Sequence, residues 1–227
     1  ETVGDSHVRG HVFPYVARRQ LEDDFGREAV LDMQVNYRTS GLAHETGAAG
    51  IVYHILGVNG ATYGSFSTPE NIQQIIDLNP DLVILSFGTN EAHGRRYSST
   101  EHIAHMDYLL GELKKGCPQA VYLLTTPPGA YVRNGRRGAR VINPRTKLVV
   151  KTEQDYAASR KLALWDMYHI VGGERRACLN WSAGNYYQRD KIHFTQDGYI
   201  LQGLLLHEAI IKSYNNYVET QLDGTRN

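Results

Sequence analysis

The feature that most constrains the fold is a regular alternation between short apolar runs and longer amphipathic segments. Residues 82–87 and 121–124 are short apolar runs bounded by turn signals. Such runs are typical of parallel strands that are covered on both faces. Segments with helical periodicity separate these runs along the chain. Strands that alternate with helices in this way favour a three-layer α/β/α sandwich around a mostly parallel central sheet.

Local signals predict where the other elements lie. Further strands are expected at residues 51–58 and 162–165. Helices are expected at 69–78, from Ser98 to Gly116, in a segment capped by Thr152, and at 196–218. Thr68 and Pro69 fit an N-cap followed by proline in the first turn, and Ser98 and Glu101 have the spacing of a capping box. Weak alternation over residues 26–50 predicts a loop or a small hairpin.

The chain begins close to its first chemically interesting residues. Only Glu1 and the two residues after it precede Gly4, so a strand leading into Gly4 would be very short. We therefore expect the strand to continue upstream of Glu1. The first residues show no charged segment followed by an apolar one, which a leader peptide needs.

Composition excludes several classes of protein. The chain has 227 residues, 41% of them hydrophobic and 21% charged, as in a globular protein with one domain over residues 1–227. Lys plus Arg and Asp plus Glu both total 24, so the net charge is zero and general nucleic-acid binding is disfavoured. The longest apolar runs, such as 82–85 and 204–206, are too short to span a bilayer, so we expect no integral membrane segment.

Polar residues suited to acyl transfer lie where expected strands end or where the last helix begins. They fall in four segments, 4–7, 57–62, 88–91 and 190–195. In a parallel α/β sheet, binding sites form beyond the carboxyl ends of the strands. Each segment alone means little, because Gly-Asp-Ser is often a plain turn and an Asp three residues before a His is often a surface pair. Their conjunction indicates a single site.

In order and spacing, the four segments resemble the SGNH (GDSL-like) hydrolases, whose name lists Ser, Gly, Asn and His from four sequence blocks. The resemblance aligns these residues with Ser6, Gly60, Asn90 and His193, and the family's histidine-orienting aspartate with Asp190. It implies the SGNH hydrolase fold with a flavodoxin-like sheet, and a carboxylic ester hydrolase with no cofactor and no metal. One departure is His7, where many members have leucine.

The roles that the resemblance implies agree with the chemistry of these side chains. Ser6 is a weak nucleophile until a base removes its proton, which His193 can do near neutral pH. Asp190 can accept a hydrogen bond from the other ring nitrogen of His193 and stabilise the imidazolium. The backbone N–H groups of Ser6 and Gly60, with the side-chain amide of Asn90, would form the oxyanion hole.

Further motifs resemble the branch that contains the bacterial peptidoglycan O-acetylesterases. They are residues 57–61, 88–92, 127–130, 165–167, 172–173 and Trp181. This resemblance implies removal of O-acetyl groups from peptidoglycan or another polysaccharide through an acyl-enzyme, in the periplasm or outside the cell. Two alternatives stay open. One is a lysophospholipase or thioesterase-type acylhydrolase, and the other is a catalytically silent carbohydrate-binding domain.

Three further groups have plainer interpretations. His93, His102 and His105 lack the ligand spacing of a zinc site, so solvated histidines on a helix face are favoured. Cys117 and Cys178 are either unlinked thiols or a single bridge. A basic run comprises Arg133, Arg136, Arg137, Arg140 and Arg145. A solvated loop is the favoured interpretation of this run, and a grip on an anionic polymer is the alternative.

Overall fold

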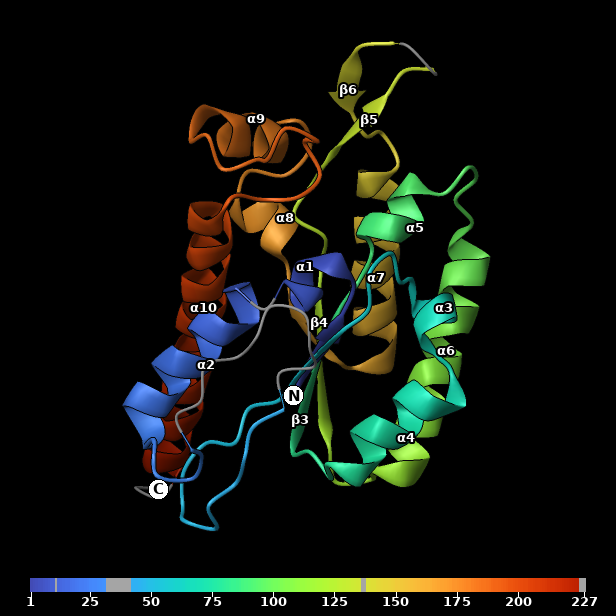
Figure 1. Ribbon diagram of the computed structural model, residues 1–227. Helices are drawn as coiled ribbons and strands as arrows, with labels where there is room; N and C mark the ends of the chain where they lie inside the picture. The colour runs from blue at the N-terminus through green and yellow to red at the C-terminus, as the bar shows by residue number, and fades with distance from the viewer. Residues whose placement is uncertain (11, 32–41, 136–137, 225–227) are drawn as a thin grey trace.

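The computed structural model describes residues 1–10, 12–31, 42–135 and 138–224. Five parallel strands form a central sheet in the order β2-β1-β3-β4-β7, and helices cover both of its faces (Figure 1). This strand order is the flavodoxin-like one. The predicted three-layer α/β/α sandwich is therefore confirmed.

The strands of the sheet are short, and the longest elements are helices in the layers around it. The sheet contains β1 (Thr2–Gly4), β2 (Ile55–Gly57), β3 (Leu82–Ser86), β4 (Val121–Thr125) and β7 (Ala163–Trp165). A separate antiparallel hairpin contains β5 (Tyr131–Arg133) and β6 (Arg140–Ile142). The helices are α1 (Ser6–Arg9), α2 (Val12–Phe25), α3 (Tyr63–Phe66), α4 (Pro69–Asp77), α5 (Thr89–His93), α6 (Ser99–Gly116), α7 (Thr146–Arg160), α8 (Met167–Ile170), α9 (Arg176–Ala183) and α10 (Gln196–Gly224).

The edge strand β2 is shorter than the pattern predicts. Its neighbour in the sheet is β1, and Thr2 of β1 pairs with Ile55 on one side and Ile84 on the other. The ladder between the two strands pairs Thr2 with Ile55, Val3 with Leu56 and Gly4 with Gly57. The prediction of a strand over 51–58 is therefore too long, because residues 51–54 lie outside this ladder.

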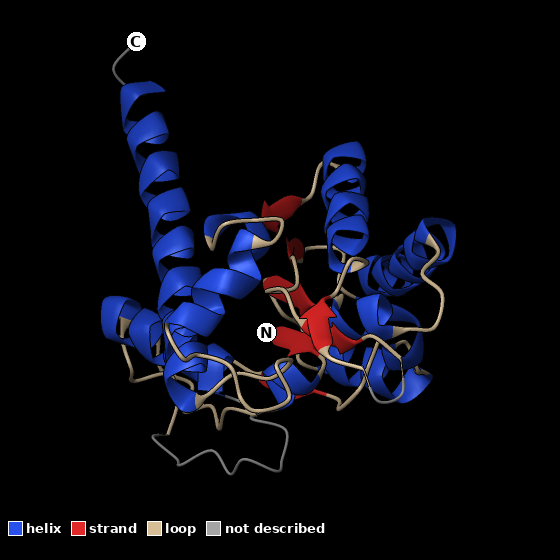
Figure 2. Ribbon diagram, turned by 90° about the horizontal axis from the view of Figure 1, so that it is seen from above, coloured by secondary structure: helices blue, strands red, loops and turns tan. Residues whose placement is uncertain are grey.

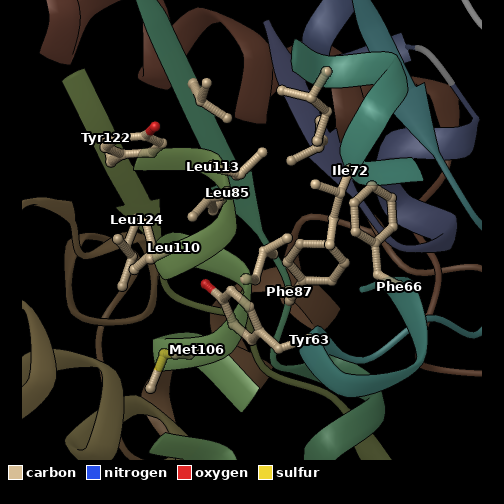
Figure 3. Close-up of a cluster of buried hydrophobic side chains, with 14 of the residues drawn as sticks. Tyr63, Phe66, Ile72, Leu85, Phe87, Met106, Leu110, Leu113, Tyr122 and Leu124 are labelled. Atoms are coloured by element: carbon tan, nitrogen blue, oxygen red, sulfur yellow. The ribbon is translucent and has the colours of Figure 1, made fainter. Parts of the chain in front are cut away.

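Two hydrophobic clusters hold the layers together. Figure 3 shows the cluster in which side chains of β3 and β4 pack against those of α3, α4 and α6. Along β3, Val83 and Leu85 belong to this cluster, whereas Ile84 belongs to the cluster beneath α2 and α10. This alternation is the two-residue period of a strand that is buried on both faces. Complete burial of such a side chain contributes about 1.5–3 kcal/mol.

The helix signals in the sequence are confirmed where the cap is local. The Thr68 side chain accepts a hydrogen bond from the Asn71 N–H at the start of α4. Ser98 accepts one from the Glu101 N–H at the start of α6. The predicted helix at 196–218 is present as α10 and runs on to Gly224, past the rest of the molecule (Figure 2).

The prediction that Thr152 begins a helix is wrong. Thr152 lies within α7, where its hydroxyl donates to the Leu148 carbonyl oxygen one turn earlier. The helix begins at Thr146, and the Asn143 side chain accepts a hydrogen bond from the Arg145 N–H just before it. Threonine makes both kinds of bond, so the sequence alone did not separate them.

The segment predicted as a loop or small hairpin is described only in part. Val30 and Glu45 form an isolated antiparallel bridge, which agrees with a hairpin at its ends. Residues 32–41, which include Asp32 and Gln34, lie outside the described residues. The helix α2 ahead of this segment was not predicted.

The sheet topology determines where a site can form. The chain leaves β1 to form β2 on one side of it and then returns to form β3 on the other side. In open α/β sheets, ligands bind outside the carboxyl ends of the strands at such a switch point. At this edge lie α1, α5, α8, α9 and the β5–β6 hairpin, in the upper half of Figure 1.

Candidate active site

Ser6 begins the short helix α1 directly after β1. Asp5 is the N-cap of this helix, and its Oδ1 accepts a hydrogen bond from the His7 N–H at 2.9 Å. The Asp5 side chain is buried, so this cap is held inside the protein. The serine hydroxyl is thereby placed at the carboxyl edge of the central strand.

The structure brings Ser6, His193 and Asp190 into one chain of hydrogen bonds. Ser6 Oγ lies 2.9 Å from His193 Nε2, and His193 Nδ1 lies 2.6 Å from Asp190 Oδ2. The side chains of His193 and Asp190 are 35% and 40% exposed, so a substrate can reach them from solvent. With Nδ1–H donating to the carboxylate, Nε2 carries the lone pair that faces the serine hydroxyl.

Asp190 is fixed by its own loop. Its Oδ1 accepts hydrogen bonds from the N–H groups of Ile192 and His193, each at 2.9 Å. Burial alone would raise the pKa of the Asp190 carboxyl, but the hydrogen bonds from His193 and from the two backbone N–H groups outweigh it and lower the pKa. Asp190 is therefore held ionised beside the imidazole.

The β5–β6 hairpin supports the loop that carries Asp190 and His193. The Tyr131 N–H donates to the Lys191 carbonyl oxygen at 2.9 Å, and the Arg140 guanidinium donates to the carbonyl oxygen of Asp190. Arg145 donates to the Ala92 carbonyl oxygen at 2.7 Å. The favoured interpretation of the basic run as a solvated loop is therefore wrong for Arg140 and Arg145.

The remaining residues of the basic run lie elsewhere. Arg133 ends β5 and is exposed. Arg136 and Arg137 lie outside the described residues.

His7, which departs from the commonest form of the family motif, is a buried neighbour of Ser6 and His193. Its ring centroid lies 5.3 Å from that of His193, and its Nδ1 lies 2.9 Å from the Tyr199 hydroxyl. Burial lowers the pKa of His7 to about 3, so this ring stays neutral. A neutral ring avoids placing a second positive charge beside His193 when that imidazole takes up a proton.

Asn90 and the segment around Gly60 meet next to the serine. Asn90 Nδ2 donates to the Ala61 carbonyl oxygen at 2.9 Å and to Asp5 Oδ2 at 3.2 Å. Gly60 has a φ of +73°, and a Cβ added there would meet nothing within 4 Å, so its backbone borders open space. The structure therefore brings together the segments of Ser6, Gly60 and Asn90.

Glu91 joins two segments of the site, and the family motif did not point to it. Its two carboxylate oxygens accept hydrogen bonds from the Tyr63 N–H at 2.7 Å and from the Gly88 N–H at 2.9 Å. Tyr63 follows the Gly60 segment, and Gly88 precedes Asn90 with a φ of +106°. Glu91 therefore fixes the two segments relative to each other. A Glu three residues after an N-cap is a signal that could have indicated this bond.

Several acidic groups near the site have raised pKa values. Burial raises the pKa of Asp5 to about 8, and it also raises the pKa of Glu91 and of Glu153. The Asp5 carboxyl is therefore mostly neutral at pH 7.

The structure bears on the interpretations of the histidines and of the two cysteines. His102 is buried and its pKa is lowered to about 4 by burial, so its interpretation as a solvated histidine is wrong. Cys117 and Cys178 are buried free thiols. Within the described ranges, no three or more His, Cys, Asp or Glu side chains gather in a way that could hold a metal ion.

This arrangement can perform acyl transfer at an ester carbonyl, since it combines a hydroxyl, a base, an orienting carboxylate and nearby amide donors. The sequence of residues 3–201 matches the model of the GDSL-like lipase/acylhydrolase family. The chain belongs to this family. It is thus a carboxylic ester hydrolase by family, as predicted.

Solved structures share the fold of this GDSL-like acylhydrolase. A peptidoglycan O-acetylesterase is similar with a TM-score of 0.74 and 17% identity, covering 95% of this chain and 91% of that one. An acetyl xylan esterase has a TM-score of 0.59 and 14% identity, covering 92% and 100%. An aryl esterase of M. smegmatis has a TM-score of 0.55 and 16% identity, covering 93% and 99%. At these identities the likeness shows the fold alone. No curated protein matches the sequence.

Two further observations concern the helices and a cavity of this acylhydrolase. Across the part of the chain that the structure describes, no helix combines the length and the apolar character that crossing a bilayer requires. A cavity of about 720 Å³ lies beside α6, α7 and α8, and its lining contains neither Ser6 nor His193.

The buried Asp5 carboxyl predicts a specific dependence of stability on pH. Its pKa is about 8 in the native protein and about 3.9 in an unfolded chain, so between these values the native state binds more protons. The stability that this group contributes is fully present below pH ~4 and is lost as pH rises to about 8.

Urea unfolding of the wild type and of Asp5→Asn measures this effect. The difference in free energy of unfolding, wild type minus variant, should decrease from pH ~4 to about 8 and then level off. Groups common to both proteins cancel in this difference. A difference that stays constant over that interval would show that the Asp5 carboxyl ionises normally.

Proposed function

We propose that this protein is a serine ester hydrolase that removes O-acetyl groups from a polysaccharide through an acetyl-enzyme intermediate. The observation that carries the proposal is the hydrogen-bonded chain of Ser6, His193 and Asp190, which is accessible to solvent at the carboxyl edge of the sheet. Family membership supports ester hydrolysis, and the polysaccharide substrate is our inference.

In the first half-reaction, His193 Nε2 takes the proton of the Ser6 hydroxyl while Oγ forms a bond to the acetyl carbonyl carbon. The resulting imidazolium is stabilised by Asp190. When the tetrahedral intermediate collapses, the bond to the sugar oxygen breaks and His193 returns its proton to that oxygen. The products are a free sugar hydroxyl and acetyl-Ser6.

In the second half-reaction, a water molecule takes the place of the sugar. His193 removes a proton from the water as its oxygen bonds to the acetyl carbon. Collapse of this second intermediate breaks the bond to Ser6 Oγ, which recovers a proton from His193. Acetic acid leaves and releases its proton to solvent as acetate forms, and the three side chains are restored to their starting states.

Negative charge develops on the carbonyl oxygen in both steps. The N–H groups of Ser6 and Gly60 and the Asn90 amide are the proposed donors to it. In the resting protein the Asn90 amide donates to Ala61 and to Asp5, and the contact to Asp5 is the longer one at 3.2 Å. A neutral Asp5 is a weaker acceptor than a carboxylate. Asn90 can therefore exchange the contact to Asp5 for the oxyanion while its hydrogen bond to the Ala61 carbonyl oxygen holds the amide in place.

Polar surroundings support a sugar rather than a lipid substrate. Gln188 is exposed, and its backbone N–H donates to the His193 carbonyl oxygen. Asn134 and Asn185 are also exposed. These side chains suit sugar hydroxyls better than an alkyl chain. The fold shared with a peptidoglycan O-acetylesterase and an acetyl xylan esterase agrees with such a substrate. A cell-wall or matrix polymer would place the protein in the periplasm or outside the cell.

Replacement of the nucleophile tests the catalytic assignment. Ser6→Ala should reduce turnover of p-nitrophenyl acetate by about 10³-fold or more, with a nearly unchanged thermal midpoint. Ser213→Ala, an exposed serine on α10, is the control and should keep full activity. A fluorophosphonate probe should label the wild type and not Ser6→Ala. Retention of most activity in Ser6→Ala would refute the assignment, and an inactive, unlabelled wild type would indicate a silent binding domain.

Replacement of Asn90 tests the oxyanion hole. Removal of one preorganised donor typically costs about 10²–10³ in kcat. Asn90→Ala should therefore lose activity mainly in kcat, with little change in KM. If only KM rises, Asn90 binds the substrate and does not stabilise the transition state.

Acyl-chain length separates the acetylesterase from the lipase-like alternative. In an apolar groove each buried CH₂ contributes about 0.8 kcal/mol, which would raise kcat/KM about fourfold per added carbon. We expect the reverse on p-nitrophenyl esters, with kcat/KM highest for acetyl, falling steeply beyond propionyl, and unchanged by EDTA. A maximum at hexanoyl or longer would identify a lysophospholipase or thioesterase-type enzyme.

A further inference from the structure

Three surface segments around the Asp190–His193 loop carry positive charge almost without acidic residues. They are residues 92–96, the hairpin residues 131–135 and 138–142, and residues 186–194, and Asp190 is the one acidic residue among them. The described Arg and Lys residues of these segments are Arg95, Arg96, Arg133, Arg140, Arg189 and Lys191. We call these six residues the cationic rim.

Direct contacts join the three segments at the catalytic edge. His93 Nε2 lies 3.2 Å from the Tyr131 carbonyl oxygen, which connects the end of α5 to the hairpin. The Tyr131 N–H donates to the Lys191 carbonyl oxygen, and Arg140 donates to the carbonyl oxygen of Asp190. The segments that carry the rim are therefore joined to one another beside the histidine–aspartate pair.

The charges of the rim are not neutralised by the described protein. None of its six residues forms an ion pair with a described carboxylate. The Asp190 carboxylate is already occupied by His193 and two backbone N–H groups. Arg95, Arg133 and Arg189 are exposed. The whole chain has zero net charge, so this excess of positive charge is local.

We propose that the cationic rim binds acidic groups, carboxylate or phosphate, on the acetylated glycan that the serine cleaves. This inference rests on the proposed function and adds the charge of the polymer to it. Guanidinium groups bind both anions with paired hydrogen bonds. A positive field around a site raises the encounter rate with anionic substrates by about 10–10³-fold. The acyl-transfer residues that lie beside the rim favour a glycan ester over a nucleic acid or a membrane.

Matched polymers test the inference. Chemically acetylated polygalacturonate is compared with the same polymer after reduction of its carboxylates to alcohols, at equal acetyl content. Acetylated mannan with and without added phosphate groups forms the second pair. Wild type should release acetate from the acidic member of at least one pair with kcat/KM at least tenfold higher, and this ratio should fall toward one in 0.5 M NaCl because salt screens exposed charges. The pair that responds identifies the acidic group.

Charge reversal in the cationic rim tests whether its arginines cause the preference for acidic polymers. The triple variant Arg95→Glu, Arg133→Glu and Arg189→Glu should lower the acidic-to-neutral ratio of kcat/KM at least tenfold. Lys212→Glu, at an exposed position on α10, is the control and should leave the ratio and the activity unchanged. Circular dichroism and the thermal midpoint confirm that each variant folds.

The outcomes separate the two proposals. If wild type releases acetate equally from both members of each pair, or if charge reversal leaves the ratio unchanged, the rim inference fails and the proposed function stands. If p-nitrophenyl acetate is hydrolysed but no acetylated glycan is, the polysaccharide assignment fails and the rim inference with it. If Ser6→Ala binds duplex DNA or anionic lipid vesicles more tightly than polygalacturonate and phosphorylated mannan, the rim serves another partner and the inference is wrong.

Discussion

The side-chain amide of Asn90 is the contact on which the geometry of the site depends. It donates to the Ala61 carbonyl oxygen and to Asp5 Oδ2. Since these acceptors follow β2 and β1 while Asn90 follows β3, one amide ties together the ends of three neighbouring strands. Asp5 also caps the helix that begins with Ser6. The distance between the serine hydroxyl and the amide donors is therefore fixed by one small network, in which a misplacement of about 1 Å can cost about 10²-fold in rate.

Buried acidic groups complete this network, and one of them, Asp5, is mostly neutral at pH 7. Glu91 joins the Tyr63 and Gly88 N–H groups, and burial raises its pKa as it raises that of Asp5. Burial likewise keeps His7 neutral behind the imidazole. The exposed Asp190, whose pKa is lowered, is thus the ionised carboxylate in direct contact with His193. The negative charge in contact with His193 is therefore on Asp190, where it can stabilise the imidazolium that forms during acyl transfer.

The sequence predicts those parts of the molecule that depend on nearby residues. The caps at Thr68 and Ser98 are local, and both helices begin where their signals indicate. The extent of β2 depends on β1, which lies far away in the chain, and Thr152 makes a bond inside a helix that the sequence does not distinguish from a cap; there the predictions are wrong. The predicted site residues meet because parallel strands end at one edge of the sheet. The contact of His7 was missed because its partner, Tyr199, lies far along the chain. Glu91 was missed although its spacing from Gly88 is a local signal.

A zero net charge conceals how charge is distributed in this protein. Equal totals of basic and acidic residues disfavour general binding of polyanions by the whole protein, but they do not describe the charge of any one face. The hairpin contains Arg133 and Arg140 with no acidic residue, and its contacts place it beside Asp190, fifty positions further along the chain from Arg140. Acidic residues such as Asp5 and Glu153 are instead buried with raised pKa values, so they do not offset the field outside. An acidic substrate would therefore meet a positive surface around the site on a protein that is neutral overall.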